Sequence, residues 1–142
     1  MDIRTCLDRI VVVESALTAT IAPTTKTVVK AYKYFPNQAY KISLSDTPCF
    51  FNGFTLQLEK RANSLRSQLY EVHSQMIVDD VDKDVAADWA AAFWAKIVDA
   101  FDSELNLKGA CTTQVLRGGQ PTLADLEWAG EHHIGQIGRA HV

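Results

Sequence analysis

The segment Asp82–Leu105 constrains the fold most, because its large apolar residues recur at every fourth position without interruption. This ridge consists of Val85, Trp89, Phe93, Ile97, Phe101 and Leu105. Charged residues occupy the other side, namely Asp84, Asp88, Lys96, Asp99 and Asp102. The spacing predicts one long amphipathic helix packed across a sheet, with Asp82 as N-cap and Gly109 as breaker. Trp94 and Val98 widen the stripe, and the aromatic residues are expected in the core, not around a cofactor.

A second helix is predicted over residues 2–21. Its apolar positions follow three- and four-residue spacing: Ile3, Cys6, Leu7, Ile10, Val13, Leu17 and Ile21. Asp2 is the expected N-cap, and Pro23 is expected to stop the helix. The run Val11–Val13 lowers helix propensity and leaves a strand as the alternative there. The helix is favoured because the spacing persists along the whole segment.

The rest of the chain predicts strands and turns. Strands are expected over 27–35, 48–58, 65–78, 110–116 and 122–128, with another beginning at Ile134. Gly53 suggests a bulge or bend. Tyr70, Val72, Met76 and Val78 alternate with Glu71, His73 and Gln75, which is typical of a half-buried strand. We expect an α+β fold: a mostly antiparallel sheet with an N-terminal helix and one long amphipathic helix across it.

Four connections are expected between these strands. They are a long loop from Asn37 to Pro48, a polar hairpin tip from Glu59 to Ser64, a glycine-rich turn over 117–121 and a second turn over 129–133. The length of the first loop suggests a role of its own or ordering by a neighbour.

The last six residues, Ile137–Val142, suggest a non-native tail. One reverse translation gives the start of a common short-read sequencing adapter, with a stop codon next in the same frame. The expected organisation is one α+β domain over residues 1–136 that lacks its C-terminal strand, followed by an adapter-derived tail over 137–142. Residues of such a tail were never selected to fit a core, so they should make almost no packing contacts.

Composition excludes several classes of function. A formal net charge of −3, with Lys60, Arg61 and Arg66 as the one loose basic cluster, argues against nucleic acid as a partner. No apolar run approaches the length that spans a bilayer, and the N-terminus lacks a signal peptide. Cys6, Cys49 and Cys111 are widely spaced, which predicts buried thiols in a reducing compartment.

Each candidate for chemistry has a simpler structural explanation. Glu131, His132 and His133 are expected in a solvated turn, because adjacent histidines on an extended chain point apart. Arg117–Gln120 lacks a phosphate-loop pattern, and the run Asp79, Asp80, Asp82 and Asp84 lacks the offsets of a calcium loop. Ser45, Asp46 and His73 show no nucleophile elbow. We therefore expect no enzyme, with no catalytic, cofactor-binding or metal-binding residues.

The order of elements resembles the tail terminator and tail-completion proteins of tailed bacteriophages. The stretches that carry this resemblance are 28–36, 69–78, the alanine-rich helix with 105–109 after it, and 125–130. The resemblance implies a structural virion protein that forms a homo-oligomeric ring, caps the tail tube and meets the head. It also implies assembly in the host cytoplasm, with tail-tube or head-connector proteins as partners. The long loop and the hairpin tip would be its docking features.

A second hypothesis is a monomeric α+β domain with a small-molecule pocket, enzymatic or not. Its pocket would be lined by Phe50, Phe51, Phe54 and Tyr70. The mass of the protein in solution distinguishes a ring from such a monomer.

Overall fold

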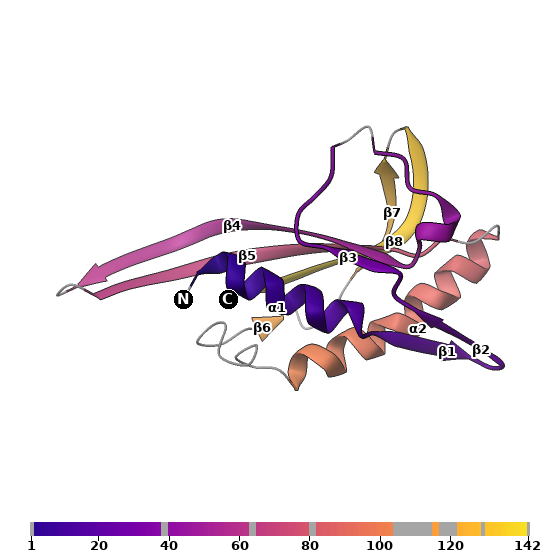
Figure 1. Cartoon of the computed structure of the whole chain (residues 1–142), viewed down its shortest axis with the longest axis horizontal. Coiled ribbons are helices and arrows are strands. Elements are labelled where there is room, and N and C mark those ends of the chain that lie inside the picture. The colour runs from indigo at the N-terminus through magenta and orange to yellow at the C-terminus, as the bar shows by residue number, and fades with distance from the viewer. Residues whose placement is uncertain are drawn as a thin grey trace.

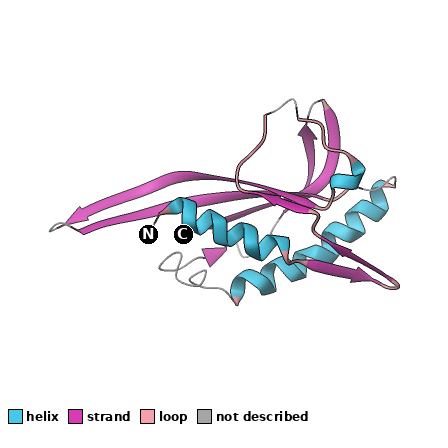
Figure 2. Cartoon of the chain, viewed as in Figure 1, coloured by secondary structure: helices cyan, strands magenta, loops and turns pink. Residues whose placement is uncertain are grey.

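In the part of the chain that the structure describes, two α-helices accompany a mostly antiparallel sheet (Figure 2). The computed structural model describes residues 2–37, 40–62, 65–79, 82–103, 115–116, 122–128 and 130–141. In chain order the elements are α1 (Ile3–Ser15), β1 (Thr18–Ile21), β2 (Thr24–Thr27), β3 (Lys30–Tyr32), a 3-10 helix η1 (Leu44–Asp46), β4 (Cys49–Ala62), β5 (Leu65–Ile77), α2 (Lys83–Asp102), β6 (Val115–Leu116), β7 (Thr122–Trp128) and β8 (Glu131–His141). The α+β prediction is confirmed. No helix in these ranges is long and apolar enough to cross a membrane.

The main sheet has the strand order β3-β4-β5-β8-β6, and β7 also pairs with β8. Only the β3–β4 pair is parallel among the described pairings. β1 and β2 form a separate antiparallel hairpin. The strands β4 and β5 are the longest, with 14 and 13 residues, and their far part projects beyond both helices (Figure 1).

The two faces of the sheet carry two separate cores. Both helices cover one face, where Leu7, Phe50, Met76 and Phe93 belong to one buried cluster. The loop after β3 and the strand β7 cover the other face, where Phe51, Ile77 and Trp128 belong to a second cluster. Successive residues of a strand point to opposite faces, so Phe50 and Phe51 supply different cores.

The long helix follows its prediction closely. α2 begins after Asp82, whose side chain accepts a hydrogen bond from the backbone N–H of Asp84. Trp89, Phe93, Ile97 and Phe101 are buried as expected, whereas Val85 and Trp94 are more than a third exposed. The buried apolar stripe of α2 is therefore narrower than predicted, because Trp94 lies outside it. Leu105 and Gly109 lie outside the described residues.

The N-terminal helix is shorter than predicted. α1 begins after the N-cap Asp2, and Val11–Val13 are helical, but the helix ends at Ser15. The segment up to Ile21 instead forms β1, which pairs with β2. Threonine at positions 18, 20, 24, 25 and 27 explains this, because β-branched residues favour strands. The four-residue spacing of the apolar residues Leu17 and Ile21 is compatible with a helix and with a strand, which is why a helix was predicted here.

Two further strand predictions need correction. The strand expected over 27–35 is divided, since Thr27 ends β2 and only Lys30–Tyr32 pair with β4. Gly53 lies in regular register opposite His73, and the bulge falls between Leu56 and Leu58. A Cβ at Gly53 would lie 2.6 Å from the Phe35 ring, so this glycine makes room for an aromatic ring.

Residues 137–142 were expected to make almost no packing contacts; their backbone, which is described as far as His141, forms part of a strand. β8 is 11 residues long, and Ile137 to His141 pair with β5. The inner edge of β5 presents unpaired donors and acceptors, which any extended chain without proline can satisfy. The second turn is also shorter than predicted: Gly130, with φ of 76°, precedes a strand that already contains Glu131 and His133.

Candidate assembly surface

The most distinctive surface is the projecting part of the β4–β5 hairpin, which we call the arm. It comprises residues 54–62 of β4 and 65–70 of β5. β8 pairs with β5 only over Glu71–Ile77, and β3 pairs with β4 only over Cys49–Phe51. Within the described residues, the two arm strands therefore pair only with each other. The bulge between Leu56 and Leu58 shifts the register by one residue in the middle of the arm, which bends and twists such a ribbon.

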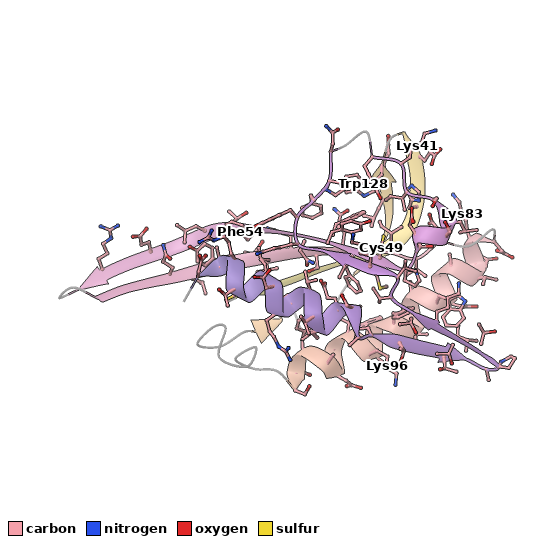
Figure 3. All side chains as sticks on the ribbon, viewed as in Figure 1. Lys41, Cys49, Phe54, Lys83, Lys96 and Trp128 are labelled. Carbon is pink, nitrogen blue, oxygen red and sulfur yellow. The ribbon has the colours of Figure 1, made fainter. Side chains whose placement is uncertain are left out.

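The base of the arm carries exposed apolar side chains. Phe54 is 41% exposed and Leu56 is 43% exposed, and Figure 3 shows Phe54 on β4 where the arm leaves the helices. The Phe54 and Tyr70 rings meet edge to face at 5.8 Å between centroids. This face continues the sheet face that α1 and α2 cover further in. Phe50 and Val72 are buried on this face, whereas Phe54 and Leu56 further out are exposed.

The outer part of the arm is more polar. Arg61 Nε lies 2.8 Å from Glu59 Oε1 in an exposed ion pair. Such a pair contributes at most about 1 kcal/mol, so it does not by itself hold the arm in place. The predicted hairpin tip from Glu59 to Ser64 is partly strand, because β4 continues to Ala62. Residues 63 and 64 lie outside the described residues.

The long loop, the other predicted docking feature, is fastened to the chain's own sheet. Ile42 is buried and Tyr40 is half-buried against the second core, and the Tyr32 and Tyr40 hydroxyls lie 3.4 Å apart. This hydrogen bond, followed by burial, raises the pKa of Tyr32 to about 12. Ser43 and Asp46 form a capping box around η1, which leaves Leu44 exposed. The loop is thus mainly a cover, with one outward apolar residue.

The histidine cluster differs from its prediction. His133 is only 5% exposed, and its Nδ1 contacts Asp79 Oδ2, so it does not lie in a solvated turn. The register of β5 and β8 brings the two residues together, which the sequence could not show. His133 Nε2 has no hydrogen-bond partner among the described residues. No group of three or more metal-ligating side chains forms there or elsewhere in the described ranges.

The remaining candidate groups are not brought together as sites. Asp46 accepts a hydrogen bond from Ser43, whereas His73 pairs with Glu71 at 3.2 Å, so no triad forms. Asp79 contacts His133 and Asp82 caps α2, which accounts for two members of the acidic run. Arg117–Gln120, Asp80 and Cys111 lie outside the described residues. Phe50 and Phe51 belong to opposite faces, so the four aromatic residues of the pocket hypothesis do not line one cavity.

A polar group that the sequence pattern does not predict lies inside the first core. Glu14 and Asn52 are both almost fully buried and are hydrogen-bonded to each other. Glu14 is not among the apolar positions from which the N-terminal helix is predicted. Its position contained a signal, because residue 14 continues the buried stripe of Leu7, Ile10 and Leu17 at helical spacing.

The buried cysteine Cys49 should be unreactive in the native protein. Burial, followed by the charges of Asp46 and Asp79, raises the pKa of its thiol to about 12. Only the thiolate reacts with disulfide reagents, and at pH 8 a pKa shift from about 8.5 reduces the thiolate roughly a thousandfold. The rate at which such a reagent labels Cys49 can be measured by peptide mass spectrometry. This rate should be lower in buffer than in urea by at least that factor. Labelling within minutes in buffer would contradict the buried position of this thiol.

Comparisons of the chain with protein-family models, with curated protein sequences and with solved structures found no match.

Proposed function

We propose that this protein is a structural component that assembles with copies of itself through the arm into a ring. In this proposal it acts in the manner of the phage tail terminators that its element order resembles. It would cap a tail tube, join the tube to the head and remain in the virion. Its partners would be its own copies and tail-tube or head-connector proteins, and no catalysis is required.

The observation that carries this proposal is the uncovered arm. A two-stranded ribbon is marginally stable in water and gains stability when another layer covers its apolar face. Phe54, Leu56 and Tyr70 form such a face, of which Phe54 and Leu56 are exposed. The far part of the hairpin projects beyond both helices (Figure 1). A neighbouring molecule that covers the arm supplies the missing layer.

A second copy is the partner that fits best, because the body of the same chain also exposes large apolar residues. These residues are Val12, Ile21, Val29, Tyr34, Leu44, Val85 and Trp94. An arm that docks on the body of the next copy makes a head-to-tail contact, and such contacts close into rings when the rotation permits. The arm and its acceptor then belong to one gene product.

Replacing both Phe54 and Leu56 with glutamate should weaken self-association by about 100-fold. Two apolar anchors would be replaced by charges, and each loss of about 1.4 kcal/mol corresponds to a factor of ten. Thr55→Glu is the matched control, because Thr55 lies between them on the same exposed strand. Sedimentation velocity over a range of concentrations measures the effect. Equal behaviour of the double variant and the wild type would remove the arm from the interface.

The ring itself is tested by electron microscopy of the purified protein, alone and mixed with tail tubes of a tailed phage. We expect rings alone and rings at tube ends in the mixture. A protein that remains monomeric at every concentration and ignores the tubes would contradict the proposal.

A further inference from the structure

Glu14 is an acidic side chain in an unusual place, and this does not depend on how the protein assembles. It lies in the last turn of α1, is 1% exposed and faces β4 and β5. The C-terminal end of a helix carries partial negative charge, which disfavours a carboxylate there. Burial of an unpaired charge is also costly. Both effects favour the neutral acid.

Hydrogen bonds connect Glu14 to the strand β4 and, through Asn52, to the neighbouring strand β5. Asn52 Nδ2 donates to Glu14 Oε1 at 2.6 Å and to the backbone oxygen of Tyr32 at 3.0 Å. Ser74 Oγ donates to Asn52 Oδ1 at 2.5 Å. Asn52 and Ser74 are directly opposite each other in the β4–β5 register, at the base of the arm.

These bonds leave an ionised Glu14 with little compensation for its charge. One N–H of the Asn52 amide goes to the backbone oxygen of Tyr32, so a single N–H of this amide serves Glu14. The hydroxyl proton of Ser74 goes to Asn52 Oδ1. One amide donor offsets only a small part of the cost of burying a carboxylate, so the neutral acid is the favoured state.

We propose that the proton on Glu14 is a latch, which fastens α1 to β4 and β5 when present and releases α1 when lost. Because Asn52 also holds Tyr32, the same proton connects α1, β3 and the base of the arm. Loss of the proton at alkaline pH should loosen these elements together.

Other charged groups near α1 are engaged elsewhere. Asp8 pairs with Lys33 at 2.7 Å. Glu71 and His73 pair with each other on β5, and their side chains point to the opposite face of the sheet from Ser74. Cys6 is a buried thiol on the same side of α1 as Leu7 and Ile10. Arg9 lies on α1, and α2 turns Phe93 and Ile97 toward the shared core. Among the described residues, no charged side chain contributes to the pKa of Glu14, which depends on burial, Asn52 and Ser74.

The resulting pH dependence has a defined sign. Burial raises the pKa of Glu14 to about 8, and the polar side chains of Asn52 and Ser74 offset only part of this rise. The folded state thus holds a proton that the unfolded state releases near pH 4.5. The stabilisation is fully present below about pH 4.5 and is lost as the pH rises toward 8. Over this window the folding equilibrium constant falls about tenfold per pH unit from this group alone.

The test is the variant Glu14→Gln, whose amide imitates the protonated acid. Its carbonyl oxygen can accept from Asn52 at any pH, and the amide carries no charge. Urea unfolding gives the folding equilibrium constant of each protein at each pH. The constant of the variant divided by that of the wild type should rise about tenfold per pH unit between pH 5 and 8. The control Asp88→Asn removes an exposed carboxylate of α2 and should give a constant ratio. A constant ratio for Glu14→Gln as well would overturn the latch.

A second measurement uses the wild-type protein and so does not depend on whether the variant folds. Carbon-13 NMR of the wild-type carboxyl groups should show one glutamate that titrates near pH 8, well above the others. Amide hydrogen exchange in α1, corrected for intrinsic rates, should accelerate over the same interval. If every glutamate titrates near its ordinary pKa, Glu14 is ionised in the fold and the proposal is wrong.

Discussion

Replacing Phe93 with alanine should lower the free energy of unfolding by about 3–5 kcal/mol. Phe93 is 0% exposed in the middle of α2 and belongs to the cluster that both helices share with the sheet. The variant loses the transfer energy of the ring and leaves a cavity that neighbouring side chains fill only in part. Urea unfolding followed by circular dichroism measures the loss, which is a large fraction of the 5–15 kcal/mol typical of a domain.

The adjacent residue provides the control. Trp94 is 37% exposed on the neighbouring position of the same helix, so Trp94→Ala should cost under about 1 kcal/mol. Similar losses for the two variants would mean that the buried face of α2 is assigned wrongly.

Replacing Gly135 with alanine should cost about 3 kcal/mol or more. A Cβ at this position would lie 1.9 Å from the backbone oxygen of Met76 and 2.9 Å from Leu126 Cδ1. Gly135 lies where β8 pairs with both β5 and β7, so the close approach joins three strands. The added methyl group must displace backbone, which is far harder than moving a side chain. Thermal unfolding should show the loss as a lower melting temperature.

The same substitution at Gly53 makes a matched comparison. A Cβ there would meet the Phe35 ring at 2.6 Å, but that ring is more than a third exposed and can move. Gly53→Ala should therefore cost under about 1 kcal/mol, mainly through the contact of Phe35 with Trp128. If Gly135→Ala proved as mild as Gly53→Ala, the pairing of β8 with β5 would be in question.

The sequence predicted the parts of the fold that depend on local pattern. The ridge of α2, the caps Asp2 and Asp82, and the long strands β4 and β5 follow from periodicity and capping chemistry. Strand β1 was missed because Leu17 and Ile21 fit a helix as well as a strand. The role of Gly53 depends on Phe35, which is remote in the chain, so no local signal reveals it.

The interior polar groups could not be predicted for the same reason. His133 meets Asp79 through a strand pairing that joins residues far apart in sequence. Glu14 meets Asn52 and Ser74 through the packing of α1 on the sheet. The pairing of residues 137–141 with β5 likewise rests on backbone hydrogen bonds, to which side-chain identity gives little guide. The loop after Asn37 was expected as a docking feature, but Ile42 and Tyr40 fasten it to the second core.

In the proposed assembly, a second copy of the chain covers the arm. Amide hydrogen exchange of residues 54–60 and 66–70, measured over increasing protein concentration, tests this claim most directly. We predict that these amides exchange more slowly as the concentration rises in the wild type and in Thr55→Glu, but not in the Phe54→Glu, Leu56→Glu double variant. Arm exchange that stays the same at every concentration, in a protein whose mass remains that of one chain, would contradict the account.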